Sequence, residues 1–147
     1  SAILEAGRLS PPACTNQPVR LCVVQRAEGL AKVDECSKCR YGAPTALIVA
    51  FDKNASAKGM GCESGDFGTI DASIVLTNMA NAAAALGLGS CWVGAYDPQA
   101  VHARFNVPAD YELVDMLMLG HPTSECTPGP RHADRFPLTQ TVSHETF

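Results

Sequence analysis

Two short segments of the chain carry residue types that could bind a ligand. In the first, residues 87–97 (GLGSCWVGAYD), Gly94 stands inside a run that is otherwise typical of a strand. A glycine weakens a strand unless something approaches its backbone closely, so Gly94 indicates a ligand ring or another chain at this point. A β-bulge or packing against a helix would use the glycine in the same way. Trp92 fits either a binding surface or the core.

The second segment covers residues 11–18 (PPACTNQP). Its prolines and its two amide side chains, Asn16 and Gln17, come directly before an apolar run and leave backbone groups exposed. A binding loop and a simple turn between a helix and a strand use the same residue types. The segment by itself therefore leaves both interpretations open.

Cys36 and Cys39 form a C-x-x-C pair. A structural zinc site needs a second pair of ligands at similar spacing, and no such pair follows. A thioredoxin-type pair follows a strand and opens a helix, whereas this pair precedes a Tyr-Gly-Ala-Pro loop. We therefore expect no metal site, and a thiol or metal function of this pair is kept as an alternative. The four histidines are dispersed and suggest no hydrolase.

Hydrophobic patterns predict the elements that position these segments. Predicted strands cover residues 20–25, 46–51, 90–96 and 112–119, and predicted helices cover residues 1–9, part of 27–42, 66–86 and a stretch from residue 97. Asp66 and Asp97 are the expected N-caps. Gly87 and Gly89 are expected to end the long helix in the left-handed conformation. The alternation predicts a single three-layer domain of α/β or α+β class, followed by an extended tail.

Composition narrows the class of protein. The 147 residues are 46% hydrophobic and 18% charged, which suits one folded domain with a core. No apolar run is long enough to cross a membrane. The net charge of −4 argues against nucleic-acid binding, which needs a basic surface. Seven cysteines, an odd number with some in apolar runs, argue against a secreted disulfide scaffold and predict a cytoplasmic protein.

Longer stretches resemble a known family. Residues 4–25 (LEAGRLSPPACTNQPVRLCVVQ), 66–101 and 109–122 resemble successive segments of the nitroreductase-like FMN-dependent oxidoreductases. The resemblance extends over almost the whole chain in the right order. It implies a mixed sheet flanked by helices, in an intertwined homodimer that binds two FMN molecules at its interface. Hydride would pass from NAD(P)H through flavin N5 to an electron-poor acceptor such as a nitroaromatic or a quinone.

The resemblance also implies roles for particular residues. In the family, a loop of the partner subunit touches the flavin ring, and its positions match Pro12, Ala13 and Cys14. The amide positions that follow this loop match Asn16 and Gln17. The strand that lines one face of the ring matches Trp92, Val93 and Gly94, with the Gly94 N–H close to flavin N5. Arg135 occupies a position from which a cation reaches the FMN phosphate, and Arg131 is a second candidate. Both arginines could instead be solvated tail residues.

Two departures from the family pattern affect these expectations. The family begins with a helix that carries an Arg-x-Ser-x-Arg type motif for FMN, and nothing in residues 1–147 corresponds to it. Because the chain starts in mid-helix without a cap, we expect this segment upstream of residue 1; the alternative is a protein that lacks the segment and binds flavin poorly. The family's serine after the first proline is replaced by Pro12 and Ala13, which removes a hydroxyl. The loop of residues 53–65 is expected to shape substrate preference. A non-catalytic flavin-binding protein of the same fold is the alternative function.

Overall fold

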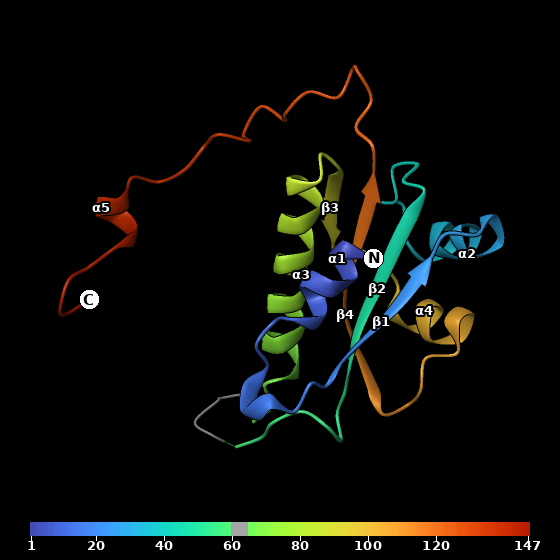
Figure 1. The fold of residues 1–147 in the computed structure, drawn as a ribbon, viewed down its shortest axis with the longest axis horizontal. Helices are drawn as coiled ribbons and strands as arrows, with labels where there is room; N and C mark the ends of the chain where they lie inside the picture. Colours follow the sequence, from blue (N-terminus) through green and yellow to red (C-terminus); the bar gives the residue numbers. More distant parts are fainter. Residues whose placement is uncertain (60–64) are drawn as a thin grey trace.

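The computed structural model describes residues 1–59 and 65–147. The elements in this part of the chain alternate between helices and strands, and Figure 1 shows their arrangement. They are α1 (Ala2–Arg8), a 3₁₀ turn η1 (Ala13–Thr15), β1 (Val19–Val24), α2 (Ala27–Cys36), β2 (Thr45–Asp52), α3 (Gly68–Ala85), β3 (Gly89–Val93), α4 (Pro98–Phe105), β4 (Tyr111–Gly120) and α5 (Leu138–Thr141).

The strands form one sheet in the order β1-β2-β4-β3. β2 lies inside the sheet and its residues 46–51 are all buried, as the continuous apolar run predicts for a strand covered on both faces. β2 and β3 run in the same direction, but β4 lies between them. Every pair among the described strands is therefore antiparallel, which corrects the expectation of a mixed sheet.

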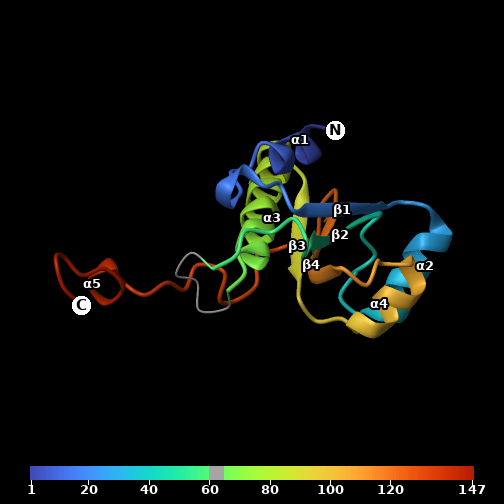
Figure 2. The same cartoon turned by 90° about the horizontal axis from the view of Figure 1, so that it is seen from below.

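Helices cover both faces of the sheet, which confirms the three-layer α+β class (Figure 2). α1 and α3 pack on one face, where Leu76 and Met79 of α3 meet Leu117 of β4. α2 and α4 cover the other face, where Val33 and Val101 meet Met116. Among the described residues, no helix is both long and apolar enough to pass through a membrane.

The helix ends test the predicted capping residues. The Asp97 carboxylate accepts hydrogen bonds from the Gln99 and Ala100 amides at 2.9 and 3.1 Å, so Asp97 is the N-cap of α4 as expected. Asp66 is not the N-cap of α3. It lies one residue earlier than the cap position, although its carboxylate still accepts from the Gly68 amide at 2.8 Å.

The glycines expected at the end of α3 behave differently from each other. Gly87 has φ +74° and ends the helix in the left-handed region, as predicted. The same prediction for Gly89 was wrong, because Gly89 is already the first residue of β3 and pairs with Gly120. Gly94 lies just after β3 rather than inside a longer strand.

Residues 121–147 form the expected tail. All of these residues are exposed, and apart from the single turn of α5 the tail has no regular element. In Figure 1 the tail runs away from the sheet and its helices.

Candidate functional site

The loop of residues 11–17 has an unusual backbone. Cys14, Thr15 and Gln17 have φ values of 52°, 58° and 53°, in the left-handed region that side-chain-bearing residues seldom occupy. Each such residue costs about 1–3 kcal/mol and persists only where the surrounding structure holds it in place, and such strain is concentrated at functional sites. Something else in the fold must therefore hold this loop.

α3 supplies the contacts that hold the loop. The Asp71 Oδ1 atom accepts a hydrogen bond from the Ala13 amide at 2.9 Å. About two helical turns further along, Asn78 Nδ2 donates to Ser10 Oγ at 2.9 Å. The loop is thus joined to the long helix at two points. Its surface remains accessible, because Cys14, Asn16 and Gln17 are exposed while Pro12 and Ala13 are half-buried.

The second predicted segment lies at the end of β3. Gly94 is exposed, and the Trp92 side chain keeps 41% of its surface accessible. Trp92 pairs with Leu117 and so lies on the α3 face of the sheet. The Val93 side chain is buried in the core on the opposite face, so only its backbone can meet a ligand. Among the described strands β3 lies at the edge of the sheet, so that β4 is its only neighbour there.

A carboxylate lies directly beneath this segment. Asp115 of β4 accepts a hydrogen bond from Trp92 Nε1 at 2.5 Å through its Oδ2 atom. A Cβ atom at position 94 would lie only 2.9 Å from Asp115 Oδ1. A side chain at position 94 would therefore push the Asp115 carboxylate aside, so the glycine suits the chain's own packing as well as any ligand that would rest there.

Tyr96 completes the polar surroundings of Asp115. The Tyr96 hydroxyl donates to the Val114 carbonyl at 3.0 Å. Burial, with the Asp115 carboxylate as a smaller cause, raises the pKa of the Tyr96 phenol above its ordinary value. Tyr96 therefore stays protonated near neutral pH and acts as a hydrogen-bond donor, not as an anion.

Sequence reasoning missed two site residues, Asp71 and Asp115. Asp71 is 2% exposed and lies one turn before Val75 on the face of α3 that packs against the sheet. A carboxylate at that helical spacing, in line with buried apolar residues, is a signal that could have found it. Asp115 is likewise the one carboxylate within the apolar run of residues 113–119 of β4, at a position that alternation assigns to the α3 face.

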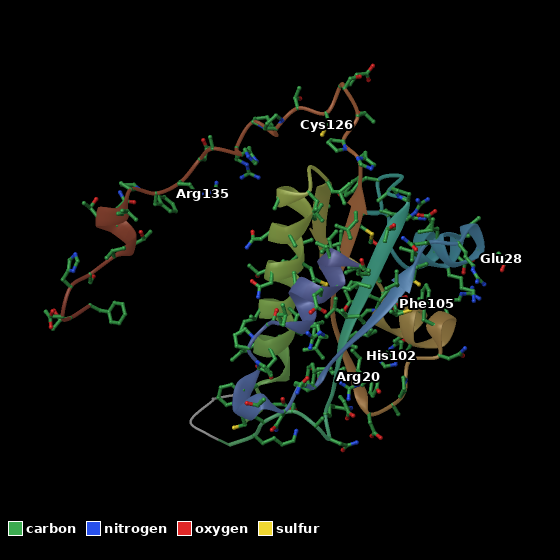
Figure 3. All side chains as sticks on the ribbon, in the orientation of Figure 1. Arg20, Glu28, His102, Phe105, Cys126 and Arg135 are labelled. Carbon is green, nitrogen blue, oxygen red and sulfur yellow. The ribbon has the colours of Figure 1, made fainter. Side chains whose placement is uncertain are left out.

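In the described part of the chain, the two predicted segments are not joined to each other by hydrogen bonds. Within the described residues, no hydrogen bond joins residues 11–17 to residues 92–94. The tail arginines also lie apart: Figure 3 shows Arg135 on the tail, away from the sheet. The Arg135 Nη1 atom donates to the neighbouring carbonyls of His132 and Asp134 at 3.1 and 2.6 Å. Arg131 is exposed on the same tail.

The outward face of α3 offers a surface on which another molecule could pack. A shallow groove of about 370 Å³ runs along it, and Ile70 in this groove is 47% exposed. The apolar residues of α3 thus lie on two sides of the helix: Val75 and Met79 face the sheet, while Ile70 is exposed. The groove is lined by Thr69, Ile70, Ser73, Ile74, Thr77 and Asn78.

The cysteine pair has different surroundings. Cys36 is buried and Cys39 is half-buried, and both are free thiols. Burial raises the pKa of the Cys36 thiol, which lowers its reactivity. The described part of the chain holds no group of three or more His, Cys, Asp or Glu side chains placed to bind a metal ion. Part of the loop of residues 53–65, namely residues 60–64, lies outside the described residues.

Comparison with known proteins agrees with this arrangement. The sequence profile of the Nitroreductase family matches residues 37–121. A Methanothermobacter thermautotrophicus protein that bears the name NADH dehydrogenase/NAD(P)H nitroreductase is 30% identical over 138 residues, which cover 88% of this chain and 67% of that protein.

Two solved structures extend the similarity to the whole fold. A nitroreductase family protein of Clostridium difficile superimposes with a TM-score of 0.89 at 32% identity, over 99% of this chain and 84% of the other. A Desulfovibrio desulfuricans nitroreductase in complex with FMN gives a TM-score of 0.78 at 27% identity, over 99% and 83%. The family profile matches more than half of this chain, and the fold matches over nearly all of it. The chain therefore belongs to the nitroreductase family.

Proposed function

We propose that this chain is an FMN-dependent oxidoreductase that passes hydride from NAD(P)H to an electron-poor acceptor, and that it acts as a homodimer with FMN at the interface. The observation that carries the proposal is the exposed backbone at Gly94, at the end of an edge strand, where no side chain stands in the way of a flat ring. Membership of the nitroreductase family and the FMN-bound Desulfovibrio desulfuricans relative support the choice of FMN.

The residues at the end of β3 fit an isoalloxazine ring. Trp92 and Gly94 are exposed, and Val93 can offer its backbone to the ring. A bound FMN would supply the hydride chemistry at its N5 atom. The role of the chain is then to place the ring, to offer the Gly94 N–H as a donor at its edge, and to leave one ring face open. Such a reaction needs no acid–base pair of the chain.

The loop of residues 11–17 is proposed to complete the site from a second copy of the chain. Pro12, Ala13 and Cys14 would meet the ring, and Asn16 and Gln17 would offer amide groups. Three features support this arrangement: the loop is exposed, it has a strained backbone, and it makes no hydrogen bond to residues 92–94 of its own chain. The half-exposed Ile70 on the outward face of α3 supplies apolar surface for subunit contact.

The tail is proposed to bring cations to the FMN phosphate. Arg135, with Arg131 as the second candidate, lies on an exposed tail that leads away from the sheet. At about 3.3 Å per extended residue, the stretch from residue 120 to 135 could span about 50 Å, enough to reach another subunit. A guanidinium binds phosphate through two parallel charge-assisted hydrogen bonds.

A visible absorption spectrum of the purified protein, mixed with FMN and then passed through a desalting column, tests the proposal. Retained flavin bands that bleach when NADH or NADPH is added without oxygen would support it. Retained flavin that neither cofactor reduces would favour the alternative, a non-catalytic flavin-binding protein of the same fold. Protein that leaves the column without flavin would contradict both.

A further inference from the structure

A buried carboxylate lies beneath the loop of residues 11–17. Asp71 is 2% exposed, and its Oδ1 atom accepts a hydrogen bond from the Ala13 amide. Its Oδ2 atom is buried without a hydrogen-bond partner among the described residues. None of the ion pairs formed within this part of the chain includes Asp71. The carboxylate is therefore only half satisfied.

Packing alone does not explain an acidic residue at this position. A buried acceptor without a hydrogen-bond partner carries an energetic cost, which is larger when the group is charged. The neighbours of Asp71 on the buried face of α3 are apolar or small, among them Gly68, Ala72 and Val75. An alanine would continue this face without the cost. The benefit of the carboxylate must therefore come from its one hydrogen bond, the bond to the loop.

The position of that hydrogen bond in the loop is informative. Ala13 immediately precedes Cys14 and Thr15, two of the residues with left-handed backbone. A fixed amide at Ala13 sets the point where the chain enters this strained turn. Without an acceptor at Asp71, the Ala13 amide would need another partner, and the entry to the strained turn would be held less firmly.

We propose that Asp71 is a positioning residue that holds residues 12–15 in their strained shape, ready to meet the flavin ring of a second copy. This inference rests on the proposed function, because the ring is the ligand that the loop would meet. Holding the loop before the ligand arrives removes the entropy cost of ordering it on binding, so it raises affinity without touching the ligand.

Three variants separate the possible roles of the carboxylate. Asp71→Asn keeps an oxygen acceptor for the Ala13 amide and removes the charge. Asp71→Ala removes the acceptor, and Asp71→Leu removes it while filling a similar volume, so that a cavity is not mistaken for the loss of the bond. Asn81→Ala on the exposed side of α3 is the matched control, because Asn81 makes no described contact with the loop.

The first measurement is amide hydrogen exchange of residues 12–15 in the flavin-free protein. We expect exchange about tenfold or more faster in Asp71→Ala and Asp71→Leu, near wild-type exchange in Asp71→Asn and Asn81→Ala, and unchanged exchange in the central strand β2 of all variants. Unchanged exchange at Ala13 in both Asp71→Ala and Asp71→Leu would overturn the proposal. If one of these two variants does not fold, the other gives the comparison.

The second measurement is the FMN dissociation constant of each variant, from quenching of flavin fluorescence. We expect FMN binding about tenfold weaker, or about 1.4 kcal/mol, in Asp71→Ala and Asp71→Leu. Asp71→Asn should recover to within about threefold of wild type, because it keeps an oxygen acceptor for the Ala13 amide. Faster exchange without a loss of FMN affinity would overturn the positioning role. Wild-type protein that binds no FMN would overturn the proposed function itself, while the exchange data would still show whether Asp71 holds the loop.

Discussion

At Gly94, both the proposed flavin ring and the neighbouring Asp115 leave little room for a side chain. A double substitution at positions 94 and 115 can separate the effect of the ring from the effect of Asp115. The backbone of Gly94 is not in the left-handed region, so alanine meets no conformational barrier there. The alanine methyl would, however, lie 2.9 Å from Asp115 Oδ1. The carboxylate would have to move by a few tenths of an ångström, away from the indole N–H of Trp92.

The size of the effect follows from that one hydrogen bond. A bond to a charged group contributes about 1.5–3 kcal/mol when buried, and the 41% exposure of Trp92 places this one near or below the lower end. We expect Gly94→Ala to lower the free energy of unfolding by about 1 kcal/mol, which is a fall in Tm of about 3 °C for a chain of this size. In an Asp115→Ala background the same substitution should cost almost nothing, because the clash has gone.

Flavin affinity should behave differently from stability. If the ring rests on the Gly94 backbone, the alanine methyl obstructs it whether or not Asp115 is present. We expect FMN binding to weaken about tenfold or more, or about 1.4 kcal/mol, in both backgrounds. Thermal unfolding of the flavin-free proteins and flavin fluorescence quenching measure the two quantities. Full recovery of FMN affinity for Gly94→Ala once Asp115 is alanine would refute the reasoning, since the glycine would then serve only the carboxylate.

Three further results are expected. Trp92 is the only tryptophan of the chain, so its emission should be quenched as FMN binds, and unchanged emission at saturating FMN would place the ring elsewhere. Arg135→Ala should weaken binding of FMN about tenfold but leave riboflavin binding unchanged, because a charge-assisted pair to phosphate contributes about 1.5–3 kcal/mol; equal losses for both ligands would contradict a phosphate contact. The hydrogen bonds from the Arg40 guanidinium lower the pKa of the Asp34 carboxyl. This pair therefore stabilises the fold at pH values above the ordinary pKa of an aspartate, and the stabilisation is lost as the pH falls through the lowered pKa. Asp34→Asn should therefore cost less than about 1 kcal/mol at pH 7 and nothing in strong acid, and a loss that persists in strong acid would contradict this assignment.

The elements that the sequence predicts well are those whose signal is local. The apolar run that becomes β2 needs no knowledge of its neighbours, and neither does the Asp97-Pro98 start of α4. Gly87 ends α3 because only glycine takes its backbone angles without strain. The order of the strands is not a local property, so the position of β4 between β2 and β3 could not be predicted in this way.

The residues of the candidate site also fall into those with a local signal in the sequence and those without one. Gly94 and the loop of residues 11–17 are visible in the sequence, because glycine, proline and amide residues mark unusual backbone. Asp115 and Asp71 become meaningful only through partners distant in sequence: Trp92 lies 23 residues from Asp115, and Ala13 lies 58 residues from Asp71. The left-handed φ of Cys14 also could not be predicted, because the position holds a cysteine and not the glycine that usually marks such backbone. A carboxylate within an apolar pattern is the signal to look for in similar chains.

The central claim is that each FMN contacts Gly94 of one copy of the chain and the loop of residues 11–17 of another copy. Mixing two variants, each with a substitution on one side of the site, tests this claim most directly. Gly94→Val would block the strand side and Ala13→Glu the loop side, and each protein alone should bind little FMN while keeping its fold by circular dichroism. Unfolding the two together and refolding them as a mixture forms mixed dimers, in which one of the two sites carries neither substitution.

The number of FMN molecules retained per chain then shows whether one copy or two copies build the site. If two copies build the site, random re-association of a symmetric dimer should restore about a quarter of the wild-type sites. A mixture that binds no more FMN than its separate components would contradict the claim and would place both segments, or neither, within the site of a single chain.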